Sequence, residues 1–385
     1  MTLSKKAQAT MMTHAVNAMA VLLLLAASLS NAQQTSTEKP FNISTISSTI
    51  PSNGDINPYG VFRIPRTVGQ LKRGNILVSN FNNSGNLQGT GTTLVQISPQ
   101  GAFSLFAQID PNNLPGPCPG GVGLTTALVV LRSGWVIVGS LPTTDGMADT
   151  AMAGCLLVLD SNGTVVKTIT DTQINGPWDM NVFDASGGND QGSGDDDHDD
   201  HRQTALFVTN VLNGTVKGGG NIVDMGTVLR INLRVPRGSA PSVESITVIG
   251  STFPERTDPA ALVIGPTGVA LNKNNKLLYV ADTLNNRIAA ISDPLTRQTS
   301  ALLGTTVSSG GNLNGPLGLT LAVNGNILTV NSNDGNLVRT TAGGAQIQTI
   351  TLDSAGAGTL FGLTDVPGQG VYFVDDGMNT LNLLH

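Results

Sequence analysis

Short apolar strands alternate with turns rich in Gly, Pro and Asn along almost the whole chain. The clearest stretch is 265–291, which reads GPTGVALNKNNKLLYVADTLNNRIAAI. A Gly-Pro turn there leads into an apolar strand at 269–271, an Asn/Lys turn leads into a second at 277–281, and a polar loop opened by Asp282 leads into a third from Arg287. Connections this short join antiparallel strands, so the stretch predicts a three-stranded meander.

The second strand of this unit has looser copies elsewhere in the chain. Each copy is an apolar run that ends in a small polar or acidic residue, and the six run ends are Asn80, Ser140, Asn210, Asp282, Asn331 and Asp375. A Gly-bearing strand start precedes each run and another apolar strand follows it. A strand-rich repeat of about 45 to 60 residues that cannot bury itself alone is typical of a propeller blade. The sequence therefore predicts an all-β fold, a six-bladed β-propeller of four-stranded antiparallel blades.

The last repeat is incomplete at its C-terminal end, because the sequence stops at His385 after the third strand of that unit. The segment 41–50 (FNISTISSTI) precedes the first repeat and alternates apolar residues with Ser and Thr. We expect this segment to pair with the last blade and close the ring, which would remove an exposed sheet edge. The alternative is a leader without regular structure.

The first residues have the features of a secretory signal. Lys5 and Lys6 precede an apolar run at 19–29, and Ser30-Asn31-Ala32 places small residues before a cut. The run is about half the ~20 residues that span a bilayer, so a retained anchor is the weaker interpretation. We expect a signal peptide at 1–32, a single propeller domain at 33–385, a secreted or periplasmic location and no membrane span after cleavage.

Composition adds three constraints. Charged residues make up 12% of the chain and Gly numbers 46, which favours turns and strands over surface helices. The formal net charge is −6 and no basic stripe is visible, so nucleic acid is not expected as a partner. The two cysteines, Cys118 and Cys155, would form a disulfide in an exported protein, which the chain-entropy model values at roughly 4 kcal/mol. The alternative is two unpaired thiols.

The stretch GPTGVAL…LYVADTLNNRI resembles the motif of the NHL-repeat β-propellers, of an exported bacterial type. The residues of the fourth repeat match the motif closely, whereas the first three repeats share only its pattern of strands and turns. It implies a six-bladed propeller. It does not imply one activity, because that family contains both enzymes and binding modules.

The repeats differ most in the loop between their second and third strands. This interval is 6 residues in the last three units (282–288, 331–337 and 375–381) and 14, 16 and 18 in the first three (80–94, 140–156 and 210–228). We expect the long loops to build a raised wall over half of one face, next to a central funnel that binds a ligand or partner. Both cysteines fall on this face, where a disulfide would fix the wall. The alternative is three surface insertions without a role.

An acidic insertion is expected on the opposite face. The segment Asn189–His201 reads NDQGSGDDDHDDH and lies between the first and second strands of the third repeat. Its carboxylates could bind Ca²⁺, but their spacing matches no EF-hand loop. Charge repulsion and low hydrophobicity favour a solvated loop.

Two sets of residues are candidates for ligand or metal binding. The six run ends would form a ring of oxygen-bearing side chains that could hold Ca²⁺ or Mg²⁺ near the axis, or each could accept backbone hydrogen bonds in its own turn. Trp178 and Asp179 stand where the fourth repeat has Thr267 and Gly268. They could contact a ligand in the funnel, or the Trp could pack beneath the acidic insertion while the Asp caps a turn.

Enzyme families with this fold set the alternatives for function. Gluconolactonase-like hydrolases hold a divalent metal on carboxylate and Asn ligands, which Asp179, Asn210 and Asp282 could imitate, but the Glu expected at the first inner strand is absent from 58–60. Histidine-dependent lyases and Ser-His-Asp hydrolases are disfavoured because only His198, His201 and His385 would remain after signal removal. The sequence therefore favours a scaffold that binds an unidentified protein or small molecule on the face of the long loops. The alternative is a metal-dependent lactonase or ester hydrolase, for which Ca²⁺ would be the cofactor.

Overall fold

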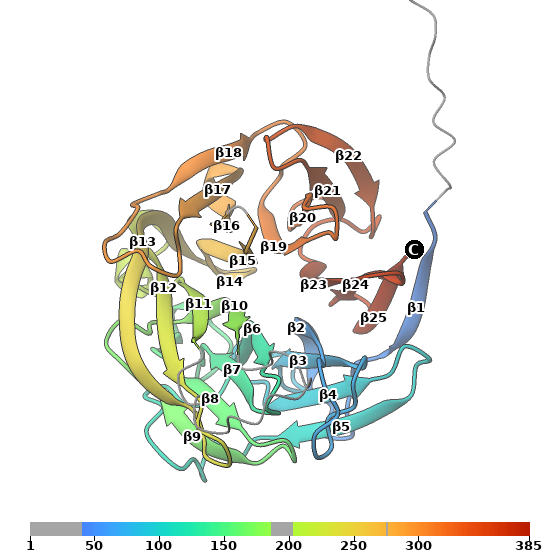
Figure 1. Ribbon diagram of the computed structural model, residues 1–385, viewed down its shortest axis with the longest axis vertical. Coiled ribbons are helices and arrows are strands. Elements are labelled where there is room, and N and C mark those ends of the chain that lie inside the picture. Colours follow the sequence, from blue (N-terminus) through green and yellow to red (C-terminus); the bar gives the residue numbers. More distant parts are fainter. Residues whose placement is uncertain (1–40, 186–202, 275) are drawn as a thin grey trace, which may run out of the picture. The chain divides into compact units, whose positions relative to one another are not determined.

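The computed structural model describes residues 41–185, 203–274 and 276–385. From Asn42 onward these form one compact unit, in which six antiparallel sheets surround a central axis (Figure 1). The predicted six-bladed β-propeller is thus confirmed. The predicted signal peptide and the acidic segment 189–201 lie outside the described residues.

Each blade is named here in chain order, with its strands given from the axis outward. Blade 1 contains β2 (Ile56–Arg63), β3 (Ile76–Asn82), β4 (Thr93–Ile97) and β5 (Phe103–Gln108), and blade 2 contains β6 (Leu124–Val130), β7 (Val136–Ser140), β8 (Leu156–Leu159) and β9 (Val165–Ile169). Blade 3 contains β10 (Pro177–Asp184), β11 (Thr204–Asn210), β12 (Val223–Arg234), β13 (Ser242–Asp258) and β14 (Leu262–Ile264). Blade 4 contains β15 (Pro266–Asn272), β16 (Leu277–Asp282), β17 (Arg287–Ser292) and β18 (Thr305–Ser309), and blade 5 contains β19 (Pro316–Leu321), β20 (Ile327–Asn331), β21 (Asn336–Thr340) and β22 (Gln346–Thr351). Blade 6 contains β23 (Leu360–Val366), β24 (Gly370–Asp375), β25 (Thr380–Leu384) and, outermost, β1 (Ile43–Ser48).

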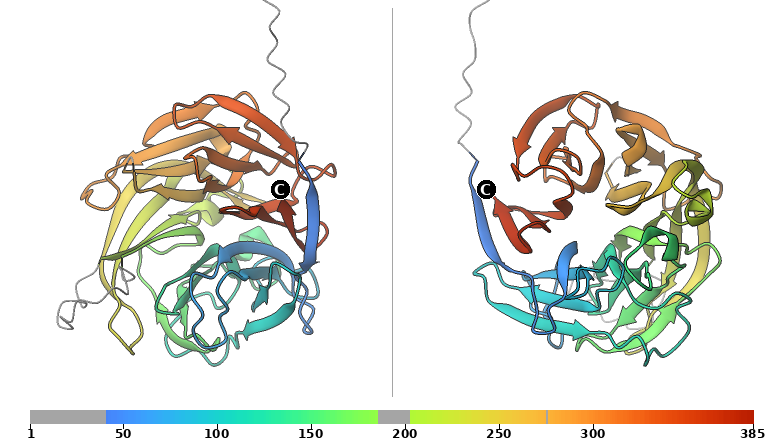
Figure 2. Two further views of the ribbon diagram at one scale, coloured as in Figure 1. Left: turned by 45° about the vertical axis from the view of Figure 1, so that its right-hand side comes forward. Right: turned by 180° about the vertical axis from the view of Figure 1, so that it is seen from behind.

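The antiparallel order gives the propeller two distinct faces (Figure 2). The chain begins each inner strand at one face, which we call the loop face, and the connections between second and third strands lie at that same face. The connections between first and second strands, and between third and fourth strands, lie at the opposite face, which we call the hairpin face. All three long loops therefore belong to the loop face.

The N-terminal segment closes the ring as predicted. Strand β1 pairs antiparallel with β25, with Ile43 opposite Leu384 and Ser48 opposite Thr380. The backbone N–H and C=O groups of Asn42 and His385 continue the ladder beyond it, at 2.9 and 3.0 Å. The edge of the last blade is thereby covered by a segment from the other end of the chain (Figure 1).

The core lies between the blades. Second and third strands are almost fully buried, and the apolar side chains of neighbouring blades pack against each other in successive clusters around the ring. Another cluster lies at the axis and includes Tyr59, Phe81, Trp178 and Phe361. No single sheet could bury both of its faces alone, which is why the repeats fold as a ring.

Blade 3 departs from the predicted four strands. Its outer strand β13 is 17 residues long and turns back into the short β14, so this sheet has five strands. The connections of blades 2 and 3 at the loop face carry a 3₁₀ turn, η1 (Ala148–Thr150), and a short helix, α2 (Thr215–Gly218). Within the described residues, no helix is long and apolar enough to cross a membrane.

Candidate functional site

The six inner strands share one sequence register at the axis. In each blade, one residue of the inner strand pairs with the run end of the second strand. In blades 1 to 6 these residues are Pro58, Leu124, Pro177, Pro266, Pro316 and Leu360. A bulge follows each of these residues. One position further along the strand stand Tyr59, Thr125, Trp178, Thr267, Leu317 and Phe361. The repeat thus brings one large or one hydroxyl-bearing side chain per blade toward the same level of the ring.

Aromatic side chains at this level close the axis. The ring of Tyr59 stacks on that of Phe361, with centroids 3.8 Å apart, and on that of Phe81, at 4.4 Å. Trp178 packs edge-on against Tyr59, at 5.7 Å. Tyr59 and Trp178 are each 1% exposed. This aromatic plug (Tyr59, Phe81, Trp178 and Phe361) separates a narrow channel on its hairpin side from a wide cavity on its loop side.

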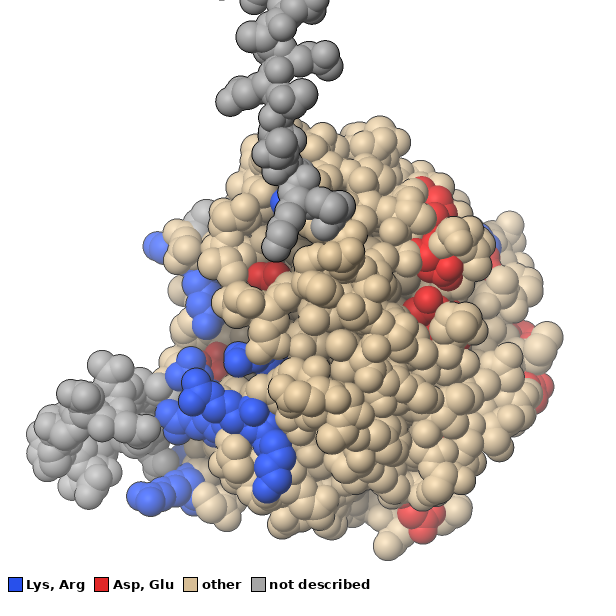
Figure 3. All heavy atoms as spheres, turned by 90° about the vertical axis from the view of Figure 1, so that its right-hand side faces the viewer, with Lys and Arg blue, Asp and Glu red and all other residues tan. Residues whose placement is uncertain are grey.

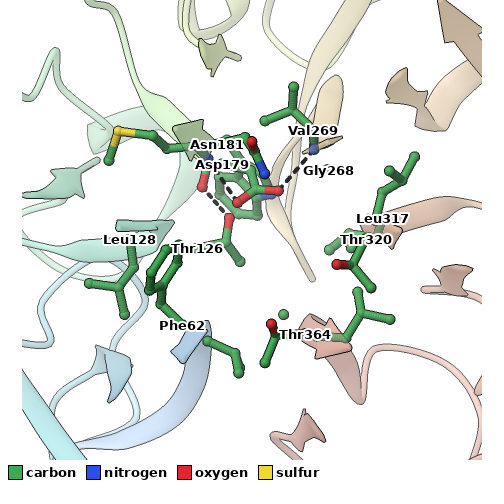
Figure 4. Close-up of a pocket in the computed structure, with 17 residues that line it drawn as sticks. Phe62, Thr126, Leu128, Asp179, Asn181, Gly268, Val269, Leu317, Thr320 and Thr364 are labelled. Carbon is green, nitrogen blue, oxygen red and sulfur yellow. Dashed lines mark hydrogen bonds between the residues drawn. The ribbon is translucent and has the colours of Figure 1, made fainter. Parts of the chain in front are cut away.

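The channel is lined by the next residues of the inner strands. These are Thr126, Asp179, Gly268, Gly318 and Gly362, and Gly60 holds the same strand position in blade 1. Close packing explains the glycines, because a Cβ on Gly318 would lie 1.9 Å from the carbonyl oxygen of Phe361 and one on Gly362 would lie 2.2 Å from that of Tyr59. The remaining space is about 70 Å³, and polar side chains of Thr126, Asp179, Asn181, Thr320 and Thr364 face it (Figure 4).

Asp179 replaces the usual glycine and spans two blades. Its carboxylate accepts backbone hydrogen bonds from Met180, at 2.8 Å, and from Val269 of blade 4, at 3.0 Å (Figure 4). Burial raises the pKa of Asp179 to about 7, although these two N–H groups oppose the shift. The side chain faces a narrow channel of about 70 Å³, so its position supports a structural link between blades better than contact with a large ligand.

The cavity on the loop face is much larger, at about 690 Å³. Volumes of this order hold small organic ligands. Its floor is formed by Tyr59, Trp178 and Phe361 of the aromatic plug, together with Leu317 and Val263. Its walls carry many amide and hydroxyl groups, from Asn57, Asn82, Asn86, Gln88, Ser332, Asn333 and Asn379. A small-molecule site needs apolar surface together with polar groups that orient the ligand, and this cavity offers both.

Two charged features lie in this cavity. On one side Arg256 forms an ion pair with Asp258, with Nη2 and Oδ2 2.7 Å apart. On the other side lies Asp376, in the turn after β24. Burial, with a smaller contribution from the negative charges of Asp375 and Asp353, raises the pKa of Asp376 to about 7, although the Gly377 N–H opposes the shift. Asp376 is therefore a carboxyl group that changes its charge near neutral pH within a ligand-sized space.

Loops of blades 1 to 3 build one part of the wall, in a different way from the prediction, and residues 332–333, 357–358, 376–377 and 379 of blades 5 and 6 line another part. The long loop of blade 1 lines the cavity, and its Gln88 Nε2 donates to the carbonyl oxygen of Ala260 in the β13–β14 hairpin, at 3.2 Å. The blade 2 loop supports it from behind, with the Thr143 N–H donating to the Gly89 carbonyl at 3.0 Å. From blade 3 the β13–β14 hairpin lines the cavity, whereas the long loop at 211–222 does not. That loop instead supports the hairpin through contacts of α2 with β13 and η1.

The predicted disulfide is confirmed, with Cys118 and Cys155 joined across the loop face. Their Cα atoms are 5.2 Å apart. The bridge connects the segment that leads into blade 2 with the end of that blade's long loop. It therefore fixes the supporting part of the wall, as the sequence suggested.

The six run ends each make local hydrogen bonds. Asn80 Nδ2 donates to the Thr49 carbonyl and to Thr93 Oγ1, both at 3.1 Å, and Asp282 pairs with Arg287 of the next strand, at 2.7 Å. The others are bonded in the same local way: Ser140 to 121 and 123, Asn210 to 175, Asn331 to 312, 314 and 334, and Asp375 to 378. Each run end lies within the connections of its own blade, so the structure favours their turn-capping role and does not assemble the cation ring.

The residues present do not fit the divalent metal that gluconolactonase-like enzymes hold. Asp179 lies in the channel beyond the plug, while Asn210 and Asp282 are buried in the hydrogen bonds of two different blades. Across residues 41–185, 203–274 and 276–385, no three His, Cys, Asp or Glu side chains are close enough to share a metal ion. The metal interpretation of Asp179, Asn210 and Asp282 therefore has no geometric basis.

Glu255 in β13 is a buried acid beside the cavity wall. The side chain is 0% exposed, and within the described residues neither carboxyl oxygen makes a hydrogen bond of ordinary geometry. Burial raises its pKa to about 9, only partly offset by the backbone N–H of Asn213. Glu255 is therefore neutral at pH 7 in the folded protein.

We predict that Glu255 makes the protein lose stability as pH rises from 7 to 9. Its folded pKa lies above the unfolded value of about 4.5, so the folded state binds the extra proton and the free energy of unfolding falls across that interval by up to about 1.4 kcal/mol per pH unit. Asp179 and Asp376 contribute mainly below pH 7, which isolates Glu255 in this window. Glu255→Gln should flatten the profile in urea titrations at pH 7, 8 and 9; an unchanged slope would contradict the assignment.

Comparison with known proteins identifies the class of fold. No protein-family model matches the sequence, and no curated protein matches it. Among solved structures, the chain is similar to a gluconolactonase from Xanthomonas campestris (12% identity, 89% of each chain, TM-score 0.52) and to a luciferin-regenerating enzyme (10% identity, 90% of this chain and 95% of the other, TM-score 0.52). It is also similar to regucalcin, a calcium-binding protein from Agrobacterium tumefaciens (13% identity, 88% and 95%, TM-score 0.50).

At these identities the likeness shows the fold alone. The chain is a six-bladed β-propeller of the shape that gluconolactonase and regucalcin share. The predicted resemblance to the NHL-repeat family stays a prediction, because no family model supports it.

Proposed function

We propose that the protein is a binding scaffold whose loop-face cavity holds a small organic ligand. The observation that carries this proposal is the cavity itself, a space of about 690 Å³ closed below by the aromatic plug and walled by amide groups. The wall is held in place by a disulfide and by the bond between Gln88 and Ala260. A preformed wall of this kind lowers the ordering cost of binding.

The test is a screen of small molecules by thermal unfolding, with a variant that fills the cavity. Ala260 is exposed and lines the mouth, so Ala260→Trp should obstruct the cavity without disturbing the core. Ala345, exposed in the β21–β22 turn at the hairpin face, supplies the control variant Ala345→Trp. A true ligand at 100 times its Kd should add about 2.7 kcal/mol of stability to the wild type and to the control, but not to Ala260→Trp. If every stabilising compound acts equally on Ala260→Trp, the cavity is not the binding site.

A hydrolase is the second candidate, favoured by the position of Asp376. A carboxyl group with a pKa about 7 inside a ligand-sized cavity has the protonation behaviour of a general base. The fold is also that of a gluconolactonase. Purified protein should then hydrolyse gluconolactone, with a loss of about 10² in kcat in Asp376→Asn and no requirement for added Ca²⁺. Activity that depends on Ca²⁺ and survives Asp376→Asn would contradict this version of the hydrolase.

A further inference from the structure

The loop-face cavity carries a net negative charge when Asp376 is ionised. The acidic and basic side chains of Asp, Glu, Lys or Arg that line it are those of Arg256, Asp258 and Asp376. Arg256 and Asp258 form an ion pair at 2.7 Å and neutralise each other. The carboxyl group of Asp376 then remains without a cation among the described lining residues.

The surroundings of Asp376 add to this charge. Asp375 lies beside it in the same turn, Asp353 approaches from the β22–β23 connection, and Tyr59 faces it from β2. Within the described residues, the titratable groups that interact with Asp376 are thus two further carboxylates and one phenol, and none of them is cationic. A site with several carboxylates attracts a cation and repels an anion.

The same sign extends over the whole face. In an edge-on view, Lys and Arg side chains gather on one side of the molecule and Asp and Glu side chains on the other (Figure 3). The strand order explains the separation. The loop-face connections carry Asp55, Asp110, Asp145, Asp149, Asp171, Asp334, Asp353 and Asp376, against Lys217. Among the described residues, the hairpin-face connections carry Arg66, Lys72, Arg73, Arg132, Arg237, Lys273, Lys276 and Arg297, against Asp160 and Asp293.

The floor of the cavity suits the hydrocarbon part of a ligand. Trp178, Leu317 and Phe361 line it, and Tyr59 is stacked beside them. At the rim, Leu87 is 39% exposed and lies between Asn86 and Gln88, which both line the cavity. A ligand with an apolar body and one charged group would match both the floor and the carboxylate.

We propose that this cavity binds a small organic ammonium ion, with its charge beside Asp376 and its apolar body on the floor of Trp178, Leu317 and Phe361. This proposal rests on the proposed binding function and specifies its ligand class. A bound ammonium ion stabilises the ionised form of Asp376, so binding releases a proton whenever that group is protonated. Affinity must therefore increase as pH rises through the pKa of Asp376.

The test uses three probes of the same shape and different charge: 2-phenylethylammonium, 2-phenylethanol and phenylacetate. Isothermal titration at pH 8 should show the ammonium ion binding at least tenfold more tightly than the alcohol, with phenylacetate weakest. Because the pKa of Asp376 is about 7, the affinity of the ammonium ion should fall about tenfold between pH 8 and pH 6, while that of the alcohol stays constant.

Variants separate Asp376 from the general charge of the face. Asp376→Asn should abolish both the preference for the ammonium ion and its pH dependence, and Asp376→Glu should retain them. Asp149→Asn removes an exposed carboxylate of the same face outside the cavity and should behave as the wild type. The proposal is overturned if the alcohol binds as tightly as the ammonium ion, or if the preference survives in Asp376→Asn. In either case, compounds whose binding is lost in Ala260→Trp would still support a binding scaffold, so the two proposals fail separately.

Discussion

Gly318→Ala should destabilise the protein by about 3 kcal/mol or more, an effect at the upper end for a single added methyl group. Gly318 lies in β19 at the level of the channel, where its Cβ would lie 1.9 Å from the carbonyl oxygen of Phe361 in the next blade. The obstacle is backbone, which cannot rotate away as a side chain does. The new methyl group must therefore push blades 5 and 6 apart at the axis.

A matched control is available in the same blade. Gly343 is in the β21–β22 turn, with its nearest neighbour 3.8 Å from a built Cβ and no positive φ. Gly343→Ala should change the free energy of unfolding by less than about 0.5 kcal/mol. Urea unfolding of both variants measures the difference; equal stability would show that the inner strands are not held as closely as the structure places them.

Glycines of this kind explain why the architecture could be predicted from sequence. The same strand position holds Gly60, Gly268, Gly318 or Gly362 in four blades, next to an apolar run of regular spacing. Such a repeat fixes the number of blades, and the alternating segment 41–50 fixes how the ring closes. The disulfide could be predicted because the topology places both cysteines on one face.

The cavity could be predicted only in outline. The long loops indicated the face on which the cavity lies. The β13–β14 hairpin that lines the cavity, however, belongs to no repeat. Its local signal was the sequence TDPAA, in which Asp258 Oδ1 accepts hydrogen bonds from the N–H groups of Ala260 and Ala261. An Asx turn of this kind marks a reversal of the chain.

The sequence analysis named Asp375, whereas the carboxyl group that lines the cavity belongs to the next residue, Asp376. The repeat drew attention to Asp375, the last residue of β24, whose side chain accepts a hydrogen bond from Met378 in its own turn. Asp376 follows it outside the strand, and it is this residue that lines the cavity. Periodicity identifies residues that every blade shares, whereas a ligand site depends on residues that differ between blades.

The separation of charge was also hidden in the sequence. Lysines and arginines are scattered along the chain, so no basic stripe could be seen. Most of those that lie in described connections fall between first and second strands or between third and fourth strands, and the strand order places these connections on the hairpin face (Figure 3). Charge patterning in a propeller therefore has to be counted by connection type, not by proximity in sequence.

Loss of the disulfide should have the other large effect on stability. Cys118 and Cys155 are 37 residues apart, and opening that loop in the unfolded chain should lower the free energy of unfolding by about 4 kcal/mol. Cys155 is fully buried, so a serine there would add the cost of a buried hydroxyl group. The double variant Cys118→Ala/Cys155→Ala is therefore the better measurement of the bridge.

The internal control is reduction of the wild type. Dithiothreitol should lower the melting temperature of the wild type to near that of the double variant and leave the variant unchanged. Because the bridge supports the blade 2 loop behind the cavity wall, ligand binding should weaken along with stability. If the double variant had the same melting temperature as the wild type, the wall would be held by the hydrogen bonds of Thr143 and Gln88 without help from the bridge.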